Sequence, residues 1–328
     1  MVAGPDGRAL DRSDWFIHSA TAASESRNMI QTAELANKRL VILGCGYLGG
    51  AVARAAAAAG MRVEALTRNR ERAAELERLG VTVVVDDLAA DAWHPRLAPG
   101  PDHVLDCVGS GGGGLDGYRH SYRAGMRSLL EWTRSRAASL IIFTSSTAVY
   151  PQGGGTVVDE DAPTEAAGPP GRILLEAEAL LRETHAARRR AVVLRLAGLY
   201  GPERHHLLDQ VRAGAADVAG EGAHHLNLAH RDDAAAAVMA LLAAPGGPDH
   251  EVFNVADDAA GTKAEVVGWL AERLGRPAPR FAGGAASRRE GFAAPPDRII
   301  SNARLKARTG WRPRYPTFRE GYAAILSA

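Results

Sequence analysis

Three glycines near one another, Gly44, Gly46 and Gly49, have the spacing of a phosphate-binding turn. In a Gly-x-Gly-x-x-Gly pattern the first glycine permits a tight turn, the second lets the backbone approach a pyrophosphate, and the third allows a helix to pack closely on a strand. Amide groups at the helix start would then bind the anion. The glycines could instead merely close a strand-helix turn. Because the pattern follows a predicted strand and opens a predicted helix, we predict a dinucleotide site that also includes Tyr47 and Leu48.

The segment after the second predicted strand carries basic residues, and reads Thr67-Arg68-Asn69-Arg70. Sites selective for NAD usually have a carboxylate here, because it accepts hydrogen bonds from the adenine ribose. A guanidinium suits a 2′-phosphate instead, since it is always charged and binds phosphate through parallel hydrogen bonds. We therefore predict a preference for NADP, with NAD as the alternative, and assign Arg68 as the main determinant with Thr67 assisting. The competing interpretation is that Arg68 and Arg70 are ordinary solvated charges.

These residues need a strand before the turn and a helix after it, and the chain provides that alternation from Lys38 onward. Short apolar runs rich in β-branched residues alternate with longer helical stretches, which is typical of βαβ units and a parallel sheet. The predicted strands are residues 39–43, 62–66, 81–85, 103–108, 140–144, 191–196 and 252–255. The predicted helices are residues 47–59, 70–79, 115–136, 172–184, 231–243 and 262–274, followed by an extended piece at 311–315 and a last short helix.

The fold class that follows is α/β, a Rossmann-type doubly wound parallel sheet with a smaller C-terminal substrate lobe. We predict a flexible leader over residues 1–37, a dinucleotide-binding core over 38–200, and a mixed substrate lobe with returning core elements over 201–328. The leader is polar and lacks clean periodicity. A misassigned start, with Met29 as the natural one, is an alternative explanation for it.

The composition narrows the classes of function. Lysine and arginine total 39 against 38 aspartates and glutamates, and no basic stripe is interleaved with aromatic residues. This balance argues against nucleic acid as a partner and favours a small-molecule substrate. No stretch approaches the roughly 18 consecutive apolar residues of a membrane span. The two cysteines, Cys45 and Cys107, cannot make a disulfide framework, so we expect a reducing compartment, by default the cytoplasm.

Two further segments carry a family resemblance. Residues 142–150 read IFTSSTAVY, and residues 170–178 read PGRILLEAE. Together they resemble the extended short-chain dehydrogenase/reductase family, in which the second segment typically reads Tyr-Gly-x-Ser-Lys-x-x-x-Glu. Pro170 stands at the tyrosine position and Leu174 at the lysine position. The departure resembles an atypical, NAD-dependent epimerase/dehydratase-like subgroup, and the resemblance extends from Lys38 to the C-terminus.

The resemblance implies an altered proton transfer. In the family the tyrosine transfers the proton, and the lysine lowers the tyrosine pKa from about 10 and binds the nicotinamide ribose. Proline and leucine can do neither. The family serine that holds the substrate oxygen falls on Ser146. Its hydroxyl neighbours, Thr144, Ser145 and Thr147, suggest an alternative in which the cluster only satisfies backbone groups at the strand end.

Nearby polar residues could replace the missing proton donor. The candidates are Tyr150, Arg172 and His205, with Tyr118, Tyr122 and His206 also considered. Imidazole titrates near neutral pH, whereas a guanidinium is a poor acid or base and could only steady a substrate anion. Each main candidate has a structural alternative: Tyr150 could pack beneath the site, Arg172 could be solvated at a helix start, and His205 could lie on a surface loop.

The same resemblance assigns further cofactor contacts. They are Asp87 and Leu88 at the adenine ring, Val108 and Gly109 at the ribose and phosphates, and Leu196 and Gly198 beside the nicotinamide. An ordinary acidic turn is the alternative for the first pair. Three histidines, His224, His225 and His230, do not share one helical face, so we expect no metal site.

Three functions remain open. The leading hypothesis is an NADP-dependent oxidoreductase or epimerase/dehydratase-like enzyme that acts on a small polar metabolite through a non-standard proton donor. The second is a catalytically silent regulatory protein that binds NADP(H). The third is a lyase or isomerase in which the cofactor is structural. By resemblance to the family, we also expect a homodimer.

Overall fold

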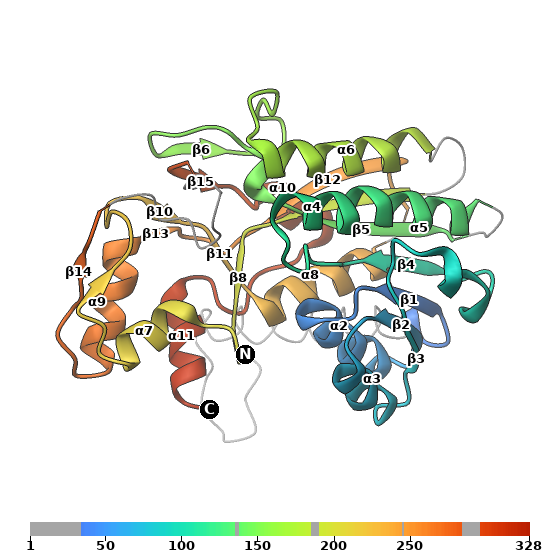
Figure 1. The fold of residues 1–328 in the computed structure, drawn as a ribbon, viewed down its shortest axis with the longest axis horizontal. Helices are drawn as coiled ribbons and strands as arrows, with labels where there is room; N and C mark the ends of the chain where they lie inside the picture. Colours follow the sequence, from blue (N-terminus) through green and yellow to red (C-terminus); the bar gives the residue numbers. More distant parts are fainter. Residues whose placement is uncertain (1–33, 135–137, 185–189, 245, 284–295) are drawn as a thin grey trace, which may run out of the picture.

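The computed structural model describes residues 34–134, 138–184, 190–244, 246–283 and 296–328 (Figure 1). Most of the expected leader, residues 1–33, therefore lies outside the described residues. Among the described residues, no helix has both the length and the apolar character needed to cross a membrane.

A seven-stranded parallel sheet forms the centre of the molecule. Its strands lie in the order β12-β7-β5-β4-β1-β2-β3, with the parallel register expected of βαβ units. They are β1 (Arg39–Leu43), β2 (Arg62–Thr67), β3 (Thr82–Val85), β4 (His103–Asp106), β5 (Leu140–Ser146), β7 (Arg190–Leu196) and β12 (His250–Val255). The strand order reverses direction between β1 and β4, and ligands bind at such a switch point in open α/β sheets. The doubly wound α/β prediction is confirmed.

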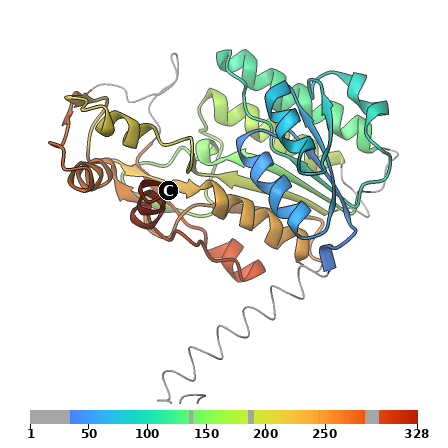
Figure 2. The ribbon, with the colours of Figure 1, turned by 90° about the horizontal axis from the view of Figure 1, so that it is seen from below.

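Helices cover both faces of this sheet (Figures 1 and 2). One layer contains α2 (Tyr47–Ala58), α3 (Arg70–Glu77) and α8 (Arg231–Ala243), and α2 packs directly on α8. The other contains α4 (Gly114–Tyr118), α5 (Gly125–Thr133) and α6 (Pro169–Thr184). Since both faces are buried, the strands are nearly continuous apolar runs.

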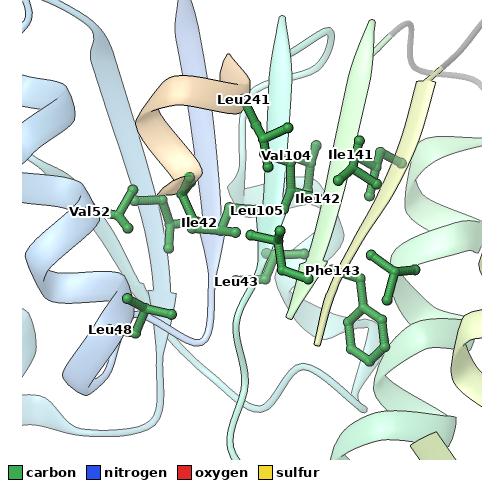
Figure 3. Close-up of a cluster of buried hydrophobic side chains, with 14 of the residues drawn as sticks. Ile42, Leu43, Leu48, Val52, Val104, Leu105, Ile141, Ile142, Phe143 and Leu241 are labelled. Atoms are coloured by element: carbon green, nitrogen blue, oxygen red, sulfur yellow. The ribbon is translucent and has the colours of Figure 1, made fainter. Parts of the chain in front are cut away.

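The core between the layers is made of side chains from adjacent strands and the helices above them. Figure 3 shows Ile42, Leu43, Val104, Leu105, Ile141, Ile142 and Phe143 from the sheet, with Leu48 and Val52 from α2 and Leu241 from α8. These side chains are almost completely removed from solvent. The burial fixes α2 against β1 and thereby fixes the glycine turn between them.

The helix predicted over residues 115–136 is interrupted. A π-helical turn, η2 (Arg119–Ala124), separates α4 from α5. A π turn inserts an extra residue into a helix and is frequent at functional sites. The helical periodicity of the sequence does not reveal it, because the helix continues on both sides.

Two other boundaries differ from the prediction for local reasons. β4 ends at Asp106 instead of residue 108, where the Asp106 carboxylate accepts a hydrogen bond from the amide of Val108 at 3.3 Å. α6 begins at Pro169, earlier than predicted, because proline is well tolerated in the first turn of a helix.

The C-terminal lobe has a small core of its own, seen at the left of Figure 1. It is built from α7 (His206–Arg212), α9 (Lys263–Arg273) and α11 (Phe318–Leu326). The helices α9 and α11 both begin with capping boxes, in which a threonine and the glutamate three residues later exchange hydrogen bonds with the first turn. In contrast, α8 and β12 return to the main sheet.

In the part of the chain that the structure describes, four short pairs of strands lie outside the seven-stranded sheet, and the sequence did not predict them. They are β6 (Thr156–Val158) with β15 (Arg298–Ile300), β8 (Gly198–Tyr200) with β11 (Leu228–His230), β9 (Asp217–Val218) with β14 (Arg280–Phe281), and β10 (His225–Leu226) with β13 (Gly261–Thr262). The turns η1 (Asp91–Arg96) and η3 (Thr147–Val149) and the helix α10 (Ala303–Thr309) were also not predicted.

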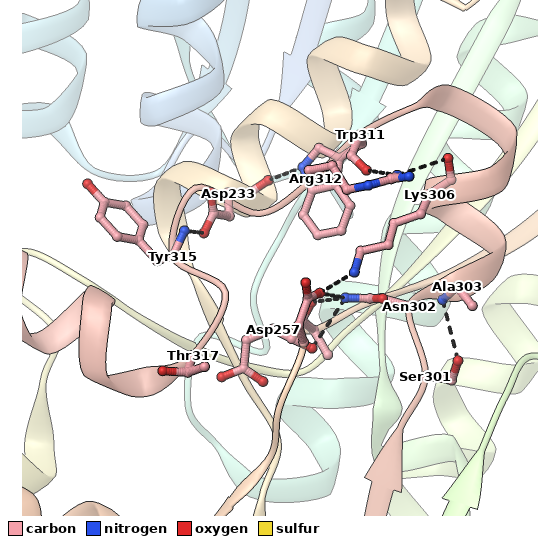
Figure 4. Close-up of polar contacts among 12 residues, drawn as sticks. Asp233, Asp257, Ser301, Asn302, Ala303, Lys306, Trp311, Arg312, Tyr315 and Thr317 are labelled. Atoms are coloured by element: carbon pink, nitrogen blue, oxygen red, sulfur yellow. Dashed lines mark hydrogen bonds and ion pairs between the residues drawn. The ribbon is translucent and has the colours of Figure 1, made fainter. Parts of the chain in front are cut away.

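The expected extended piece at 311–315 forms no strand and is held instead by the carboxylate of Asp233 (Figure 4). That carboxylate accepts the amides of Arg314 at 2.7 Å and Tyr315 at 3.0 Å, and the Trp311 indole donates to the Asp233 carbonyl at 3.2 Å. The tail is thereby tied to the start of α8.

Candidate functional site

The turn between β1 and α2 needs glycine at two of its three positions for reasons internal to the protein. Gly44 has a φ of +81°, and a Cβ there would lie 2.5 Å from backbone atoms of Val108. A Cβ on Gly49 would lie 2.8 Å from the Cys107 sulfur and 2.9 Å from the Gly44 carbonyl. Gly46 is different, because a Cβ there would lie no closer than 3.9 Å to another atom, the Gly44 carbonyl oxygen. Tight packing therefore explains Gly44 and Gly49, but it does not explain Gly46.

Gly46 borders a cavity of about 660 Å³ at the carboxyl ends of the first four strands. The cavity is lined by most of the cofactor residues that the sequence predicted, namely Gly44, Gly46, Thr67, Arg68, Asp87, Leu88, Val108 and Gly109. It lies at the switch point of the sheet, beside the N-terminus of α2. A glycine cradle, helix amides and a cationic edge in one cavity fit a dinucleotide.

The predicted cofactor residues that are not among those lining this cavity are Tyr47, Leu48, Gly49, Leu196 and Gly198. The Leu48 side chain packs in the core (Figure 3), because the helix turns it toward the sheet. The Tyr47 hydroxyl donates to the Pro202 carbonyl at 2.9 Å, and the guanidinium groups of Arg204 and Arg231 lie over its ring. The side chains of Tyr47 and Leu48 are not among those that line the dinucleotide cavity, and contact of their backbone amides with a cofactor stays a prediction. Tyr47 instead joins the start of α2 to the C-terminal lobe.

Arg68 presents its charge at the edge of the cavity. Its side chain is 51% exposed, and its Nη1 atom lies 3.2 Å from Asp87 Oδ2. The neighbouring Thr67 hydroxyl accepts the amide of Asn69 at 3.2 Å, and the Asn69 side chain accepts the amide of Arg72 at 2.9 Å, which caps α3. The turn that carries Arg68 is therefore fixed, while the guanidinium itself is accessible.

Asp87 is held in its ionised form. Burial raises the pKa of its carboxyl, but hydrogen bonds from the Ala89 amide and from His120, with the charge of Arg68, outweigh burial and hold the pKa below its ordinary value. The next residue, Leu88, is buried. The pair thus offers a charged acceptor beside an apolar surface, as an adenine ring requires.

The hydroxyl cluster lies at the end of β5. The Ser146 hydroxyl accepts the amide of Ala148 at 3.2 Å and so caps η3. This contact uses a lone pair and leaves the hydroxyl hydrogen available for a substrate oxygen. In the register of β5 and β7, Ser146 lies opposite Leu196, and Gly198 starts β8 just beyond. The residues predicted beside the nicotinamide are therefore brought to the same end of the sheet.

A buried polar network lies behind this turn. The Ser145 hydroxyl donates to Glu178 at 2.6 Å, Glu178 pairs with Arg195 at 2.7 Å, and Arg195 donates to the Tyr150 hydroxyl at 3.0 Å. The Tyr150 hydroxyl in turn donates to Asn254 at 2.8 Å. Tyr150 is 1% exposed, and burial raises its pKa. Both hydrogen-bonding functions of Tyr150 are used inside the protein, which favours its structural interpretation over proton transfer.

The other candidate proton donors have local partners as well. Arg172 donates to the Ala167 carbonyl at 2.8 Å and so holds the loop before α6. His205 lies 2.8 Å from Asp209 in the first turn of α7. Neither residue is among those that line the dinucleotide cavity. Leu174, at the family lysine position, is completely buried in the core.

Sequence reasoning missed two buried charged groups. Arg298 is 4% exposed and donates to the Thr147 carbonyl at 2.7 Å, directly after Ser146, while its Nε atom has no hydrogen-bond partner. Burial lowers its pKa to about 10. Asp106 ends β4, is fully buried, and has one oxygen without a partner. Asp106 could have been recognised from the sequence, because it is an acidic residue at the end of an apolar run. No local pattern identifies Arg298.

The fold and cavity define a Rossmann-type dinucleotide-binding protein. The model of the NAD dependent epimerase/dehydratase family matches residues 40–256, and the chain belongs to this family.

Several relatives align over nearly their whole length. Protein YeeZ of Escherichia coli (strain K12) is 29% identical over 288 residues, which cover 85% of this chain and 97% of that protein. The 3-diazoavenalumate denitrifying reductase of a Streptomyces species is 29% identical over 306 residues, covering 86% and 98%. The structure of MoeE5 in complex with UDP-glucuronic acid and NAD has a TM-score of 0.76 at 21% identity, covering 88% of this chain and 98% of that one. At that identity the likeness shows the fold alone.

Proposed function

We propose that this protein is an NADP-dependent oxidoreductase or epimerase/dehydratase-like enzyme that acts on a small polar metabolite. The observation that carries the proposal is the half-exposed guanidinium of Arg68 at the edge of the cavity, where NAD-selective sites usually have a carboxylate. A similar chain named as a reductase supports redox chemistry.

Different residues of the cavity would bind different parts of the cofactor. The amides at the start of α2 and the bare backbone of Gly46 would hold the pyrophosphate, Arg68 the 2′-phosphate, and Asp87 the adenine. When bound, the nicotinamide supplies or accepts a hydride. Ser146 would orient the substrate by donating its hydroxyl hydrogen to a substrate oxygen.

Proton transfer must differ from that of the wider family. Pro170 and Leu174 carry no titratable group, and the Tyr150 hydroxyl is occupied by Arg195 and Asn254. We propose that the proton moves through a residue outside the family pair or through water. This favours reactions with a modest demand for general acid catalysis.

Calorimetric titration of the wild type and Arg68→Ala with NADPH and NADH tests the cofactor assignment. We expect Arg68→Ala to reduce the preference for NADPH about tenfold, because a hydrogen-bonded charge pair with the phosphate is lost. Arg134→Ala, which removes an exposed arginine paired with Glu131, is the matched control. An unchanged NADPH/NADH affinity ratio in Arg68→Ala would overturn the assignment.

A catalytically silent NADP(H)-binding protein is the second candidate. The observation that favours it is the complete burial of Leu174 at the position of the family lysine. Binding of NADPH without its oxidation across a broad panel of polar metabolites would support this function. Turnover in which the bound cofactor is never oxidised or reduced, even transiently, would instead support a lyase or isomerase with a structural cofactor. Homodimerisation and a cytoplasmic location stay predictions.

A further inference from the structure

Asp87 is held from two sides by polar side chains, the guanidinium of Arg68 and the imidazole of His120. On one side Arg68, at the end of β2, contacts Oδ2 at 3.2 Å. On the other side His120, in η2, contacts Oδ1 at 3.0 Å, and the amide of Ala89 also donates to Oδ1 at 2.8 Å. The two oxygens therefore have separate sets of partners. Losing Arg68 would leave Oδ1 fully bonded.

The π turn explains how His120 reaches Asp87. On its inner side the rings of Tyr118 and Tyr122 pack 5.2 Å apart, and Tyr122 packs on Phe143 of β5. A single extra residue rotates the following side chains by about 100° relative to an uninterrupted helix. With the tyrosines anchored inside, His120 faces the end of β3, and its neighbour Ser121 lines the dinucleotide cavity.

Arg68 also lies against the glycine-rich loop that follows β4. Its Nη2 atom occupies the place that a Cβ on Gly111 would take, so the glycine-rich loop after β4 passes directly over the guanidinium. Because Gly111 carries no side chain, Arg68 can lie between this loop and Asp87. The Arg68 side chain nevertheless remains 51% exposed, so a ligand in the cavity can reach it.

We infer that His120 is a positioning residue for cofactor selection. It keeps Asp87 paired, so that Arg68 can leave Asp87 and bind the 2′-phosphate of NADP. A guanidinium in a parallel, two-bond contact with phosphate cannot keep the same contact with Asp87. Without His120, Asp87 would keep only the Ala89 amide beside Arg68, so the partly buried carboxylate would hold Arg68 more strongly, since a poorly satisfied charge there is unfavourable. With NAD, which has no such phosphate, Arg68 stays on Asp87. The inference rests on the proposed NADP preference.

A double-mutant cycle tests this role. Calorimetry would measure the dissociation constants of NADPH and NADH for the wild type, His120→Ala, Arg68→Ala and the double variant at one salt concentration. We expect His120→Ala to weaken NADPH binding about three- to tenfold, toward the lower end of the coupling between groups in contact, and to leave NADH binding unchanged. In the Arg68→Ala background the same substitution should change neither constant. His120→Gln, whose amide can still donate to Asp87, should restore part of the NADPH affinity.

The outcomes distinguish failure of the role of His120 from failure of the proposed NADP preference. If His120→Ala weakens NADPH equally in both backgrounds, His120 acts independently of Arg68 and the inference is wrong. Equal weakening of NADPH and NADH would reveal a purely structural role and would also overturn it. If Arg68→Ala lowers the preference for NADPH but His120→Ala does not, the inference alone fails. An Arg68→Ala variant with wild-type preference would remove the NADP proposal itself.

Discussion

Two regions at the carboxyl edge of the sheet each contain an arginine, and the two arginines differ in exposure and in the number of their hydrogen bonds. At the dinucleotide cavity, Arg68 is 51% exposed and contacts only one oxygen of Asp87. Behind the β5 turn, Arg195 has a side chain that is 8% exposed and makes hydrogen bonds to Glu178 and Tyr150. The first arrangement leaves a charge available to a ligand. The second uses charges to fix the protein itself.

The two regions differ in how closely they resemble the corresponding parts of the family's active site. The glycine turn and the cationic edge keep the form of a dinucleotide site. At the other end, the family lysine position is an apolar core residue, Leu174, and the Tyr150 hydroxyl is hydrogen-bonded to Arg195 and Asn254. The cavity thus has the geometry of a dinucleotide site, while the polar groups around Tyr150 bond mainly to one another.

The largest effect should come from breaking the buried pair. Glu178→Ala leaves Arg195 as a buried charge without its counterion, so we expect a loss of about 3–5 kcal/mol in the free energy of unfolding. Urea denaturation measures this loss. The control, Glu131→Ala, removes an exposed ion pair and should change stability by less than about 1 kcal/mol. Similar losses in the two variants would contradict the structural role of the network.

A second substitution probes the cavity side. Gly44→Ala would place a Cβ against the backbone of Val108, so we expect about 3 kcal/mol of destabilisation from strain and overpacking, with loss of cofactor binding. Gly80→Ala is the matched control, since its φ of +78° is nearly the same but a Cβ there meets nothing within 4 Å. It should cost about 1 kcal/mol and bind cofactor normally. Equal behaviour of the two variants would mean that crowding at Val108 is unimportant.

Asp106 lies between the two regions and makes stability depend on pH. Burial raises the pKa of its carboxyl from 3.8 to about 7. Between those values the native state keeps a proton that the unfolded chain releases, so the Asp106 contribution falls as pH rises through this window and levels above it. Relative to the wild type, Asp106→Asn should therefore gain about 2–3 kcal/mol of stability between pH 5 and pH 8. Denaturation curves at both pH values check this, and a constant difference would contradict it.

The smallest expected effect comes from two neighbouring serines at the end of β5, of which only Ser145 bonds to the buried network. Ser145→Ala removes a donor from buried Glu178 and should destabilise the protein by about 1–2 kcal/mol. Ser146→Ala removes a cap from a short turn and should destabilise it by less than about 1 kcal/mol. Thermal unfolding of both variants measures the difference. A larger loss for Ser146→Ala would indicate that Ser146 is structural instead of available to substrate.

Sequence patterns predicted the sheet and most of the cavity because both depend on local signals. Apolar runs mark the parallel strands, and the glycine spacing and the basic strand end mark the dinucleotide site. The His120–Asp87 contact depends on a π turn that helical periodicity does not reveal. The hydrogen-bond partners of Tyr150 come from β7 and β12, far along the chain. They meet only in the folded protein, so no local pattern predicts them. The two- and three-residue strand pairs of the lobe likewise form only when distant segments meet.

The central claim is that the accessible charge at the cavity edge selects NADP, and direct titration of the wild-type protein tests it. NADPH and NADH would be titrated by calorimetry into the same preparation at the same ionic strength. We expect NADPH to bind at least about tenfold more tightly than NADH, since Arg68 forms a charged contact with the 2′-phosphate that NADH lacks. Equal affinities, tighter binding of NADH, or binding of neither cofactor would contradict it.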